Sequence, residues 1–266
     1  MIKKILWGLV FLVSLYVGVL MFLNANQRNM QYKPGDGASN IVELSEVNLP
    51  DAKIVTILTT QYLSVRGWYQ APIGDKPLIL YFKGNEGSFT EEYTRFEDMV
   101  KDGYGFLAFD YRGFPMSPGR ISQDNILHDA LAVFDWAESK GHEIILFGRS
   151  LGSGPATYVA ANRVAYGLIL ETPFTSASDV AAERYPLLPV SKLIIDSYKV
   201  SDWIADVDEP LLVAHGSADK VIPFVHSEKV FALANNPQKL WEVEGGTHGS
   251  LWNDGLWDQI TQFVEQ

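Results

Sequence analysis

Three patterns of apolar and polar positions follow one another along the chain. The first is an unbroken apolar run, Ile5 to Leu23, which is long enough to cross the hydrocarbon core of a bilayer as a helix. A polar stretch with proline and glycine comes next and is typical of a tether. The third pattern alternates short apolar runs with amphipathic stretches. We therefore expect a membrane anchor at residues 1–24, a tether at 25–51 and one globular domain at 52–266.

The alternation in the third part predicts a doubly wound sheet. Two strand-like runs come first, and the fully apolar run Leu78 to Phe82 has the pattern of a buried central strand. Strands that alternate with helices form a mostly parallel sheet with helices on both faces. The expected strands, about eight in number, are 54–60, 64–69, 78–82, 105–109, 143–147, 167–170, 210–214 and 239–243, and the expected helices are 89–101, 124–140, 151–163, 224–234 and 251–264.

Residues 172–209 interrupt this alternation. The segment carries three prolines, which break regular elements, before a strand resumes the rhythm. We expect a small insertion that covers the carboxyl ends of the strands as a lid. Its apolar residues either bind acyl chains or pack within the lid; they are Leu187, Leu188, Leu193, Ile194 and Ile195.

The N-terminal apolar run favours a retained anchor over a cleaved signal peptide. Its apolar core is longer than in most signal peptides, and Leu23-Asn-Ala-Asn26 is a poor cleavage site. Because Lys3 and Lys4 precede the run, the positive-inside rule predicts a single-pass protein with a cytoplasmic N-terminus. The domain would then lie on the exterior or periplasmic side, although Arg28 and Lys33 on that side weaken the bias.

Charge and cysteine content exclude several classes of function. The net charge is -11 and no basic cluster follows residue 33, which argues against a nucleic-acid partner. The chain has no cysteine, so disulfides, a thiol nucleophile and lipid attachment through cysteine are excluded. The histidines and carboxylates show no metal-ligand spacing, and we expect neither a metal nor a cofactor. The expected partners are an acyl or lipid-like small molecule and the membrane.

The most specific motif is Gly148-Arg-Ser-Leu-Gly152, which lies between an apolar strand and a helix-forming stretch. In a nucleophile elbow such a turn holds its central residue in a strained backbone conformation, and the flanking glycines let strand and helix pass closely. Ser150 is therefore the candidate nucleophile.

Reactive groups in an open parallel sheet lie beyond the carboxyl ends of the strands. Two such loops carry Asp219 and His248, which follow Ser150 in an order typical of one hydrolase fold. His248 is the expected base because its glycine-bounded loop lets the ring reach Ser150. Asp219 would orient that ring. Its rival, Glu171, is expected to be a structural acceptor, and His215, which competes with His248, a structural hydrogen-bonding residue.

An oxyanion hole needs two backbone N–H groups, one from the residue after the nucleophile and one from the loop after the central strand. These are expected to be the N–H groups of Leu151 and Asn85. The alternative is that residues 83–88 only form a glycine loop that caps the next helix.

Together these residues resemble the α/β-hydrolase superfamily over about residues 52–265. More narrowly, the chain is similar to membrane-anchored, small-lidded serine hydrolases, which include depalmitoylating thioesterases and lysophospholipase-like and serine-aminopeptidase-like relatives. The segments that carry the resemblance are Lys83-Gly-Asn85, Asp110-Tyr-Arg-Gly113, Gly148-Arg-Ser-Leu-Gly-Ser-Gly154, Glu171-Thr-Pro-Phe-Thr-Ser176, His215-Gly-Ser-Ala-Asp219 with Ile222-Pro223, and His248-Gly249.

The resemblance implies the α/β-hydrolase fold and hydrolysis of an ester, thioester or amide through an acyl-enzyme, without a cofactor. Two departures stand out. Lys83 occupies a place where the family usually has histidine, and Phe114-Pro-Met-Ser117 replaces a glycine-containing turn. The Lys83 ammonium would attract an acidic substrate or pair with a carboxylate.

We expect a serine hydrolase acting on a carboxylic ester or thioester with a lipid-like acyl group. The first alternative is a serine aminopeptidase-like amide hydrolase, because a small lid leaves room for a peptide end. The second is a non-catalytic, membrane-tethered interaction module that keeps only the fold.

Overall fold

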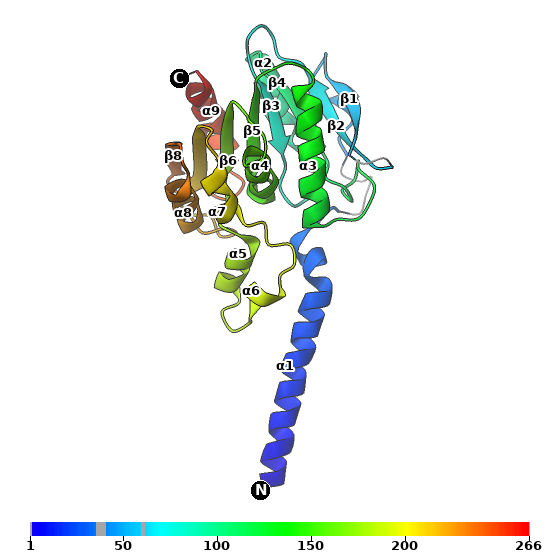
Figure 1. Ribbon diagram of the computed structural model, residues 1–266, viewed down its shortest axis with the longest axis vertical. Coiled ribbons are helices and arrows are strands. Elements are labelled where there is room, and N and C mark those ends of the chain that lie inside the picture. Colours follow the sequence, from blue (N-terminus) through cyan, green and yellow to red (C-terminus); the bar gives the residue numbers. More distant parts are fainter. Residues whose placement is uncertain (1, 36–40, 60–61, 266) are drawn as a thin grey trace.

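A computed structural model describes residues 2–35, 41–59 and 62–265, and in it one long helix projects from a domain built on a single sheet (Figure 1). Residues 36–40 of the predicted tether and residue 60, the end of the first predicted strand, lie outside the described part.

The sheet has eight strands in the order β1-β2-β4-β3-β5-β6-β7-β8. The strand β2 pairs antiparallel with β1 and β4, and every other neighbouring pair is parallel. The predicted mostly parallel sheet is therefore confirmed. The strands are β1 (Lys53–Leu58), β2 (Ser64–Gln70), β3 (Leu78–Phe82), β4 (Gly105–Phe109), β5 (Ile144–Arg149), β6 (Gly167–Glu171), β7 (Leu211–Gly216) and β8 (Pro237–Val243).

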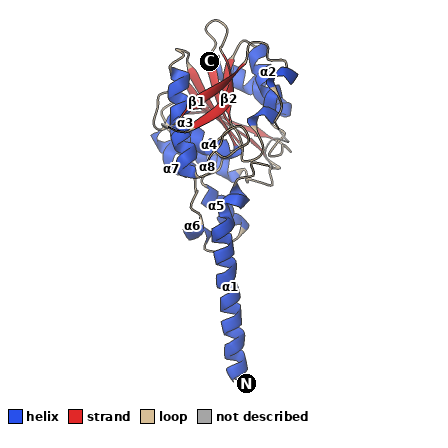
Figure 2. Ribbon diagram, turned by 90° about the vertical axis from the view of Figure 1, so that its right-hand side faces the viewer, coloured by secondary structure: helices blue, strands red, loops and turns tan. Residues whose placement is uncertain are grey.

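Helices cover both faces of the sheet, so that the strands lie between two helical layers (Figure 2). One face carries α3 (Gln123–Glu138), α4 (Ser153–Ala160), α7 (Val200–Trp203) and α8 (Val225–Leu233), and the other carries α2 (Tyr93–Lys101) and α9 (Trp257–Val264). Three predicted helices start later than expected. The 3₁₀ turn Phe89–Glu92 precedes α2, and the 3₁₀ turn Ser150–Gly152 precedes α4. The π-helical turn Trp252–Leu256 precedes α9.

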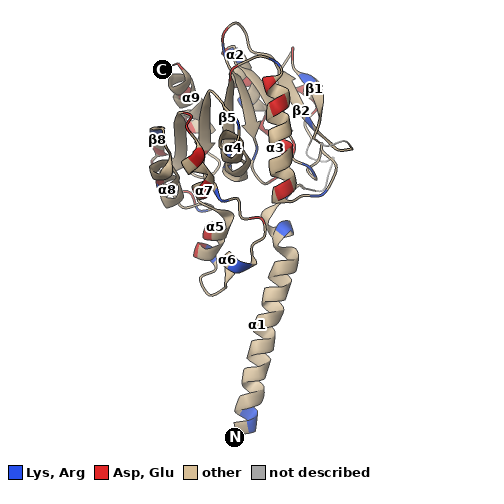
Figure 3. Cartoon of the chain, viewed as in Figure 1, with Lys and Arg blue, Asp and Glu red and all other residues tan. Residues whose placement is uncertain are grey.

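The long helix α1 (Ile2–Gln31) has no buried residue and is long and apolar enough to cross a membrane. Figure 3 shows it free of charge between the lysines near its start and Arg28 near its end. It continues through residues 25–31, which we predicted to begin the tether. These residues contain neither glycine nor proline, and their polar side chains contact the domain, so the helix does not end with the apolar run.

Contacts between α1 and the domain fix the direction of the helix. Arg28 donates two hydrogen bonds to Asp196, at 2.8 and 3.2 Å. Tyr32 is buried, and its hydroxyl lies 3.0 Å from Asp196 Oδ2 and 2.9 Å from the hydroxyl of Tyr198. Farther on, Leu49 is buried in the core of the domain. The described ends of the predicted tether therefore pack against the domain.

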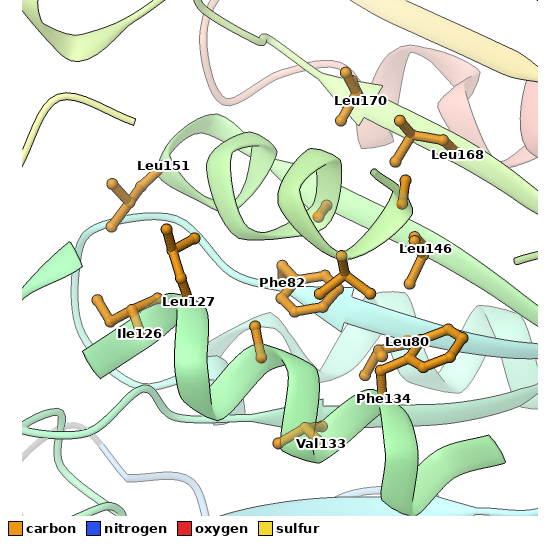
Figure 4. Packing of buried hydrophobic residues seen from close by; sticks show 14 of the residues in the cluster. Leu80, Phe82, Ile126, Leu127, Val133, Phe134, Leu146, Leu151, Leu168 and Leu170 are labelled. Carbon is orange, nitrogen blue, oxygen red and sulfur yellow. The ribbon is translucent and has the colours of Figure 1, made fainter. Parts of the chain in front are cut away.

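The core between the sheet and the helices is apolar and closely packed. Every residue of β3, β4 and β6 is buried, as expected for central strands with helices on both faces. In Figure 4, Leu80, Phe82 and Leu146 from the strands pack against Val133 and Phe134 of α3. Burying each such side chain contributes about 1.5–3 kcal/mol to folding. This packing holds the carboxyl ends of the strands, which carry the site, in fixed positions.

The predicted insertion contains two further short helices, α5 (Ala177–Arg184) and α6 (Val190–Leu193). Both lie beside the C-terminal part of α1, between the sheet and the projecting half of that helix (Figures 1 and 2). We refer to residues 172–209 as the lid.

Candidate active site

The turn after β5 has the backbone geometry expected of a nucleophile elbow. Ser150 has φ of 51°, one of three positive values among the described non-glycine residues. A Cβ atom at Gly148 would lie 2.5 Å from the carbonyl oxygen of Gly152, and one at Gly152 would collide with the carbonyl group of Phe82. Strand and helix therefore approach so closely that both positions require glycine.

Three predicted site residues form one hydrogen-bonded chain. His248 Nε2 lies 2.9 Å from Ser150 Oγ, and His248 Nδ1 lies 2.7 Å from Asp219 Oδ2. The side chain of Asp219 is fully buried, while that of His248 is 20 % exposed. Ser150 follows β5, Asp219 follows β7 and His248 follows β8, so the parallel strands bring together side chains that are far apart in the sequence.

The environment of Asp219 keeps its carboxylate ionised. Burial alone would raise its pKa, but hydrogen bonds from His215 and His248, the charge of His248 and the backbone N–H of Ile222 hold the pKa well below its usual range. Because the folded pKa lies below the unfolded value, ionised Asp219 stabilises the fold above that unfolded value. This contribution is lost as the pH falls through the folded pKa.

Glu171, the predicted rival of Asp219, and His215, the predicted rival of His248, both have other partners. Glu171 accepts hydrogen bonds of 2.7 and 3.0 Å from Arg95, in a buried ion pair, and makes no hydrogen bond to His248 among the described contacts. His215 is fully buried; its Nδ1 lies 2.6 Å from Ser227 Oγ, and its Nε2 lies 2.9 Å from the Ile222 carbonyl oxygen. It therefore braces the loop that carries Asp219.

Asn85 and Leu151, the two predicted oxyanion-hole residues, line the same cavity as Ser150. The loop of Asn85 is held by the end of α1 and the residues after it, because the Asn85 side chain donates to the Gln31 carbonyl at 2.7 Å and the Asn85 carbonyl accepts from the Lys33 N–H at 2.8 Å. The loop after β3 thus contacts the end of α1 in addition to leading into the next helix.

Lys83 does not reach the cavity. Its side chain is fully buried, and Nζ donates to the carbonyl oxygens of Gly84 at 3.1 Å and Glu86 at 3.0 Å and lies 4.0 Å from the centre of the Phe114 ring. Burial lowers its pKa to about 8, against the opposing influence of Asp110. The sequence suggested that the Lys83 ammonium attracts an acidic substrate or pairs with a carboxylate. In the structure, it instead donates hydrogen bonds to the backbone of its own loop.

The cavity at Ser150 has a volume of about 330 Å³ and is lined mainly by apolar side chains. Sequence reasoning missed one wall, which α1 forms with Leu23, Asn24, Gln27, Met30 and Gln31. The sequence did contain a signal that the helix continues into this wall: Leu23, Gln27 and Met30 have helical spacing, and no glycine or proline lies between them. Within the described ranges, no group of three or more histidine, aspartate or glutamate side chains is arranged to hold a metal ion.

Comparisons with known proteins agree with this architecture. A family model described as serine aminopeptidase, S33, matches residues 79–203. An uncharacterized protein of Mycobacterium tuberculosis is 34 % identical over 258 residues, which cover 94 % of this chain and 91 % of the relative. The alpha/beta hydrolase domain-containing protein WAV2 of Arabidopsis thaliana is 29 % identical, covering 71 % of this chain and 70 % of WAV2. A solved structure of a Pyrococcus furiosus esterase superposes with a TM-score of 0.66 and 19 % identity, covering 87 % of this chain and 98 % of the esterase.

Proposed function

Because the chain belongs to the α/β-hydrolase superfamily, we propose that it is a serine hydrolase that cleaves a carboxylic ester or thioester through an acyl-enzyme. The observation that carries this proposal is the hydrogen-bonded chain from Ser150 through His248 to buried, ionised Asp219, with Ser150 on an apolar cavity. Nucleophile, base and orienting acid are the parts that acyl transfer requires.

In the first half of the proposed reaction, His248 Nε2 takes the proton of Ser150 Oγ as the oxygen attacks the carbonyl carbon. The tetrahedral intermediate collapses, the bond to the alcohol or thiol breaks, and the leaving group receives the proton from His248. In the second half, water gives a proton to His248 and attacks the acyl carbon, and the carboxylic acid departs as Ser150 regains its proton. Asp219 stabilises the imidazolium in both halves.

The backbone N–H groups of Leu151 and Asn85 are the proposed donors to the developing oxyanion. Lys83 supports this arrangement because its ammonium binds the carbonyl oxygen of Gly84. The described chain has no cis peptide bond, and in a trans peptide the C=O and the following N–H point in opposite directions. Holding the Gly84 carbonyl toward Lys83 therefore directs the Asn85 N–H away from Lys83, and we assign Lys83 as a positioning residue.

This role predicts an alkaline loss of activity. As the pH rises through about 8, the Lys83 ammonium loses its proton and its hydrogen bonds to the loop lose their charge. We expect kcat of the native protein to fall above this pH, and Lys83→Met to lower kcat at pH 7 by about tenfold to a hundredfold with little change in KM. The measurement is kcat from pH 6 to 10, corrected for spontaneous ester hydrolysis.

The folding stability should change in the opposite direction. Because the pKa of Lys83 is lower in the folded state than in the unfolded chain, burial of the ammonium destabilises the fold below pH 8, and that cost is relieved as the pH rises toward the unfolded value.

For the dependence of kcat on pH, the surface variant Lys140→Met is the matched control, and it should keep the native profile of kcat against pH. An alkaline limb that persists unchanged in Lys83→Met would contradict the assignment.

We also propose that α1 spans a bilayer with its N-terminus in the cytoplasm and the domain on the exterior or periplasmic side. Exposure of its apolar side chains and the lysines at its start support this placement. Protease digestion of intact cells and of spheroplasts tests it, because a domain fully protected in spheroplasts would contradict the orientation.

The lining of the cavity favours acyl substrates over peptides. Among the described residues that line it, none has a carboxylate to bind the amino group of a peptide, and the charged one is Arg184. We expect the purified chain to hydrolyse acyl esters and thioesters with kcat/KM at least about tenfold above aminoacyl amides of matched leaving group. A panel of these substrates in detergent micelles measures the ratio. Preference for aminoacyl amides would instead support the aminopeptidase, and no hydrolysis of any of them would favour a non-catalytic module.

A further inference from the structure

The lid extends along α1 into the depth range of the proposed membrane span. Tyr16 Oη donates to the carbonyl oxygen of Leu187 at 3.4 Å. Tyr16 precedes Leu23, the last residue of the apolar run, by seven positions, which is about 10 Å along a helix axis. Side chains on a helix lean toward its N-terminus, so the Tyr16 hydroxyl lies deeper still. When α1 spans a bilayer, Leu187 therefore lies inside the hydrocarbon core.

Hydrogen bonds fix this depth. Gln27 donates to the Leu193 carbonyl at 3.1 Å and accepts from the Ile195 N–H at 2.8 Å. Gln31 donates to the carbonyl of Asp196 at 2.9 Å. With the ion pair between Arg28 and Asp196, these contacts follow successive turns of α1. The tip of the lid is thus held at a fixed position along the helix.

The tip of the lid has the chemistry of a membrane-inserted element. Leu187 is 89 % exposed and Ile195 61 % exposed, so neither packs within the lid. The apolar tip, residues 185–190, is flanked by the exposed cations Arg184 and Lys192. Long basic side chains hold their charge at the phosphate level while neighbouring apolar groups enter the acyl region. Left in water, the tip would be an unfavourable apolar patch.

The cavity connects this region with the nucleophile. Its walls include Ser150 at one side of the lid, Val180 and Leu188 within the lid, and Leu23 on α1. Leu23 ends the apolar run, so the cavity extends from the nucleophile to the level at which the bilayer begins.

We propose that the tip of the lid, residues 185–190, is immersed in the leaflet from which α1 emerges, and that acyl lipids pass laterally from that leaflet into the cavity between α1 and the lid to reach Ser150. The acyl chain lies between the two elements and its carbonyl group lies at Ser150. This inference rests on the proposed hydrolase function and on the proposed membrane span, and it specifies the substrate as a bilayer lipid.

Insertion is measured without reference to activity. The chain has no cysteine, so Leu187→Cys in the full-length protein carries a single nitroxide spin label, with Val164→Cys, 86 % exposed on the domain, as the control. In phosphatidylcholine vesicles, we expect collisions of the 187 label with an aqueous nickel complex to be about tenfold rarer than those of the 164 label, and collisions with oxygen to be more frequent. Equal access of the nickel complex to both labels would overturn the insertion.

The route is tested with Leu187→Glu, because Leu187 does not line the cavity. We expect hydrolysis of a long-chain acyl ester in vesicles to fall about tenfold or more, since a charge at the tip opposes insertion, while hydrolysis of a short soluble ester is unchanged. Val164→Glu should change neither. An equal loss on both substrates, or no loss on the vesicle substrate, would overturn the lateral route. If the native protein hydrolyses neither ester, the proposed function fails, and the spin-label result still decides on insertion.

Discussion

Replacing Ser150 by alanine should lower kcat/KM for every ester substrate by about 10⁴-fold or more and abolish labelling by a fluorophosphonate. This variant removes the hydroxyl that His248 is proposed to deprotonate, and no other described side chain hydrogen-bonds His248 Nε2. The remaining oxyanion donors and cavity still bind substrate, so a small residual rate is expected. The measurement pairs gel-based labelling of the full chain with kcat/KM on a soluble acyl ester.

The matched control is Ser153→Ala, three residues farther along the chain. The Ser153 hydroxyl is buried and has no hydrogen-bond partner among the described residues, so its removal leaves no unsatisfied group. We expect this variant to label and turn over like the native protein. Labelling of Ser150→Ala at the native level would show that another residue is the nucleophile, and the proposed mechanism would be wrong.

Replacing Asp219 by asparagine should lower kcat by about 10³–10⁴-fold with a much smaller effect on KM. The amide has nearly the same shape, but it carries no charge to stabilise the His248 imidazolium. It also places an N–H donor among four donors, two from backbone N–H groups and two from histidine rings. His248 would then adopt the wrong tautomer or orientation. The measurement is kcat and KM on the same soluble ester, with thermal unfolding to correct for the folded fraction.

Asp135→Asn is the control for charge removal. Asp135 is an aspartate on α3 that pairs with Arg163 at 2.6 Å, remote from the cavity. Its loss should leave kcat unchanged because exposed ion pairs contribute little to stability. If Asp219→Asn keeps more than about a tenth of native kcat, Asp219 is not the orienting acid, and Glu171 becomes the residue to test.

The fold and the hydrogen-bonded chain were predictable because they depend on local patterns. All-apolar runs such as Leu78 to Phe82 are typical of strands buried on both faces. The glycines at 148 and 152 are required by the close passage of strand and helix, and the loops that carry Asp219 and His248 follow strands whose carboxyl ends share one edge of the sheet.

The missed features depend on contacts between distant segments. The docking of α1 rests on Arg28 and Tyr32, whose partner Asp196 is more than 160 residues away, and an exposed polar helix end has the same composition as a tether. Lys83 bonds to backbone carbonyls, which every residue carries, so its side-chain type could not identify its partners.

The wall that α1 gives to the cavity means that the proposed membrane span and the proposed substrate site share residues. A soluble fragment that begins after residue 31 would lack Gln27 and Met30, and the cavity would open to water on that side. It would also leave the buried carboxylate of Asp196 without its guanidinium partner. Under both proposals, substitutions in the last two turns of α1 would have to satisfy the lipid headgroups and the bound substrate at once. We therefore expect the selectivity of the protein and the composition of its host membrane to change together during evolution.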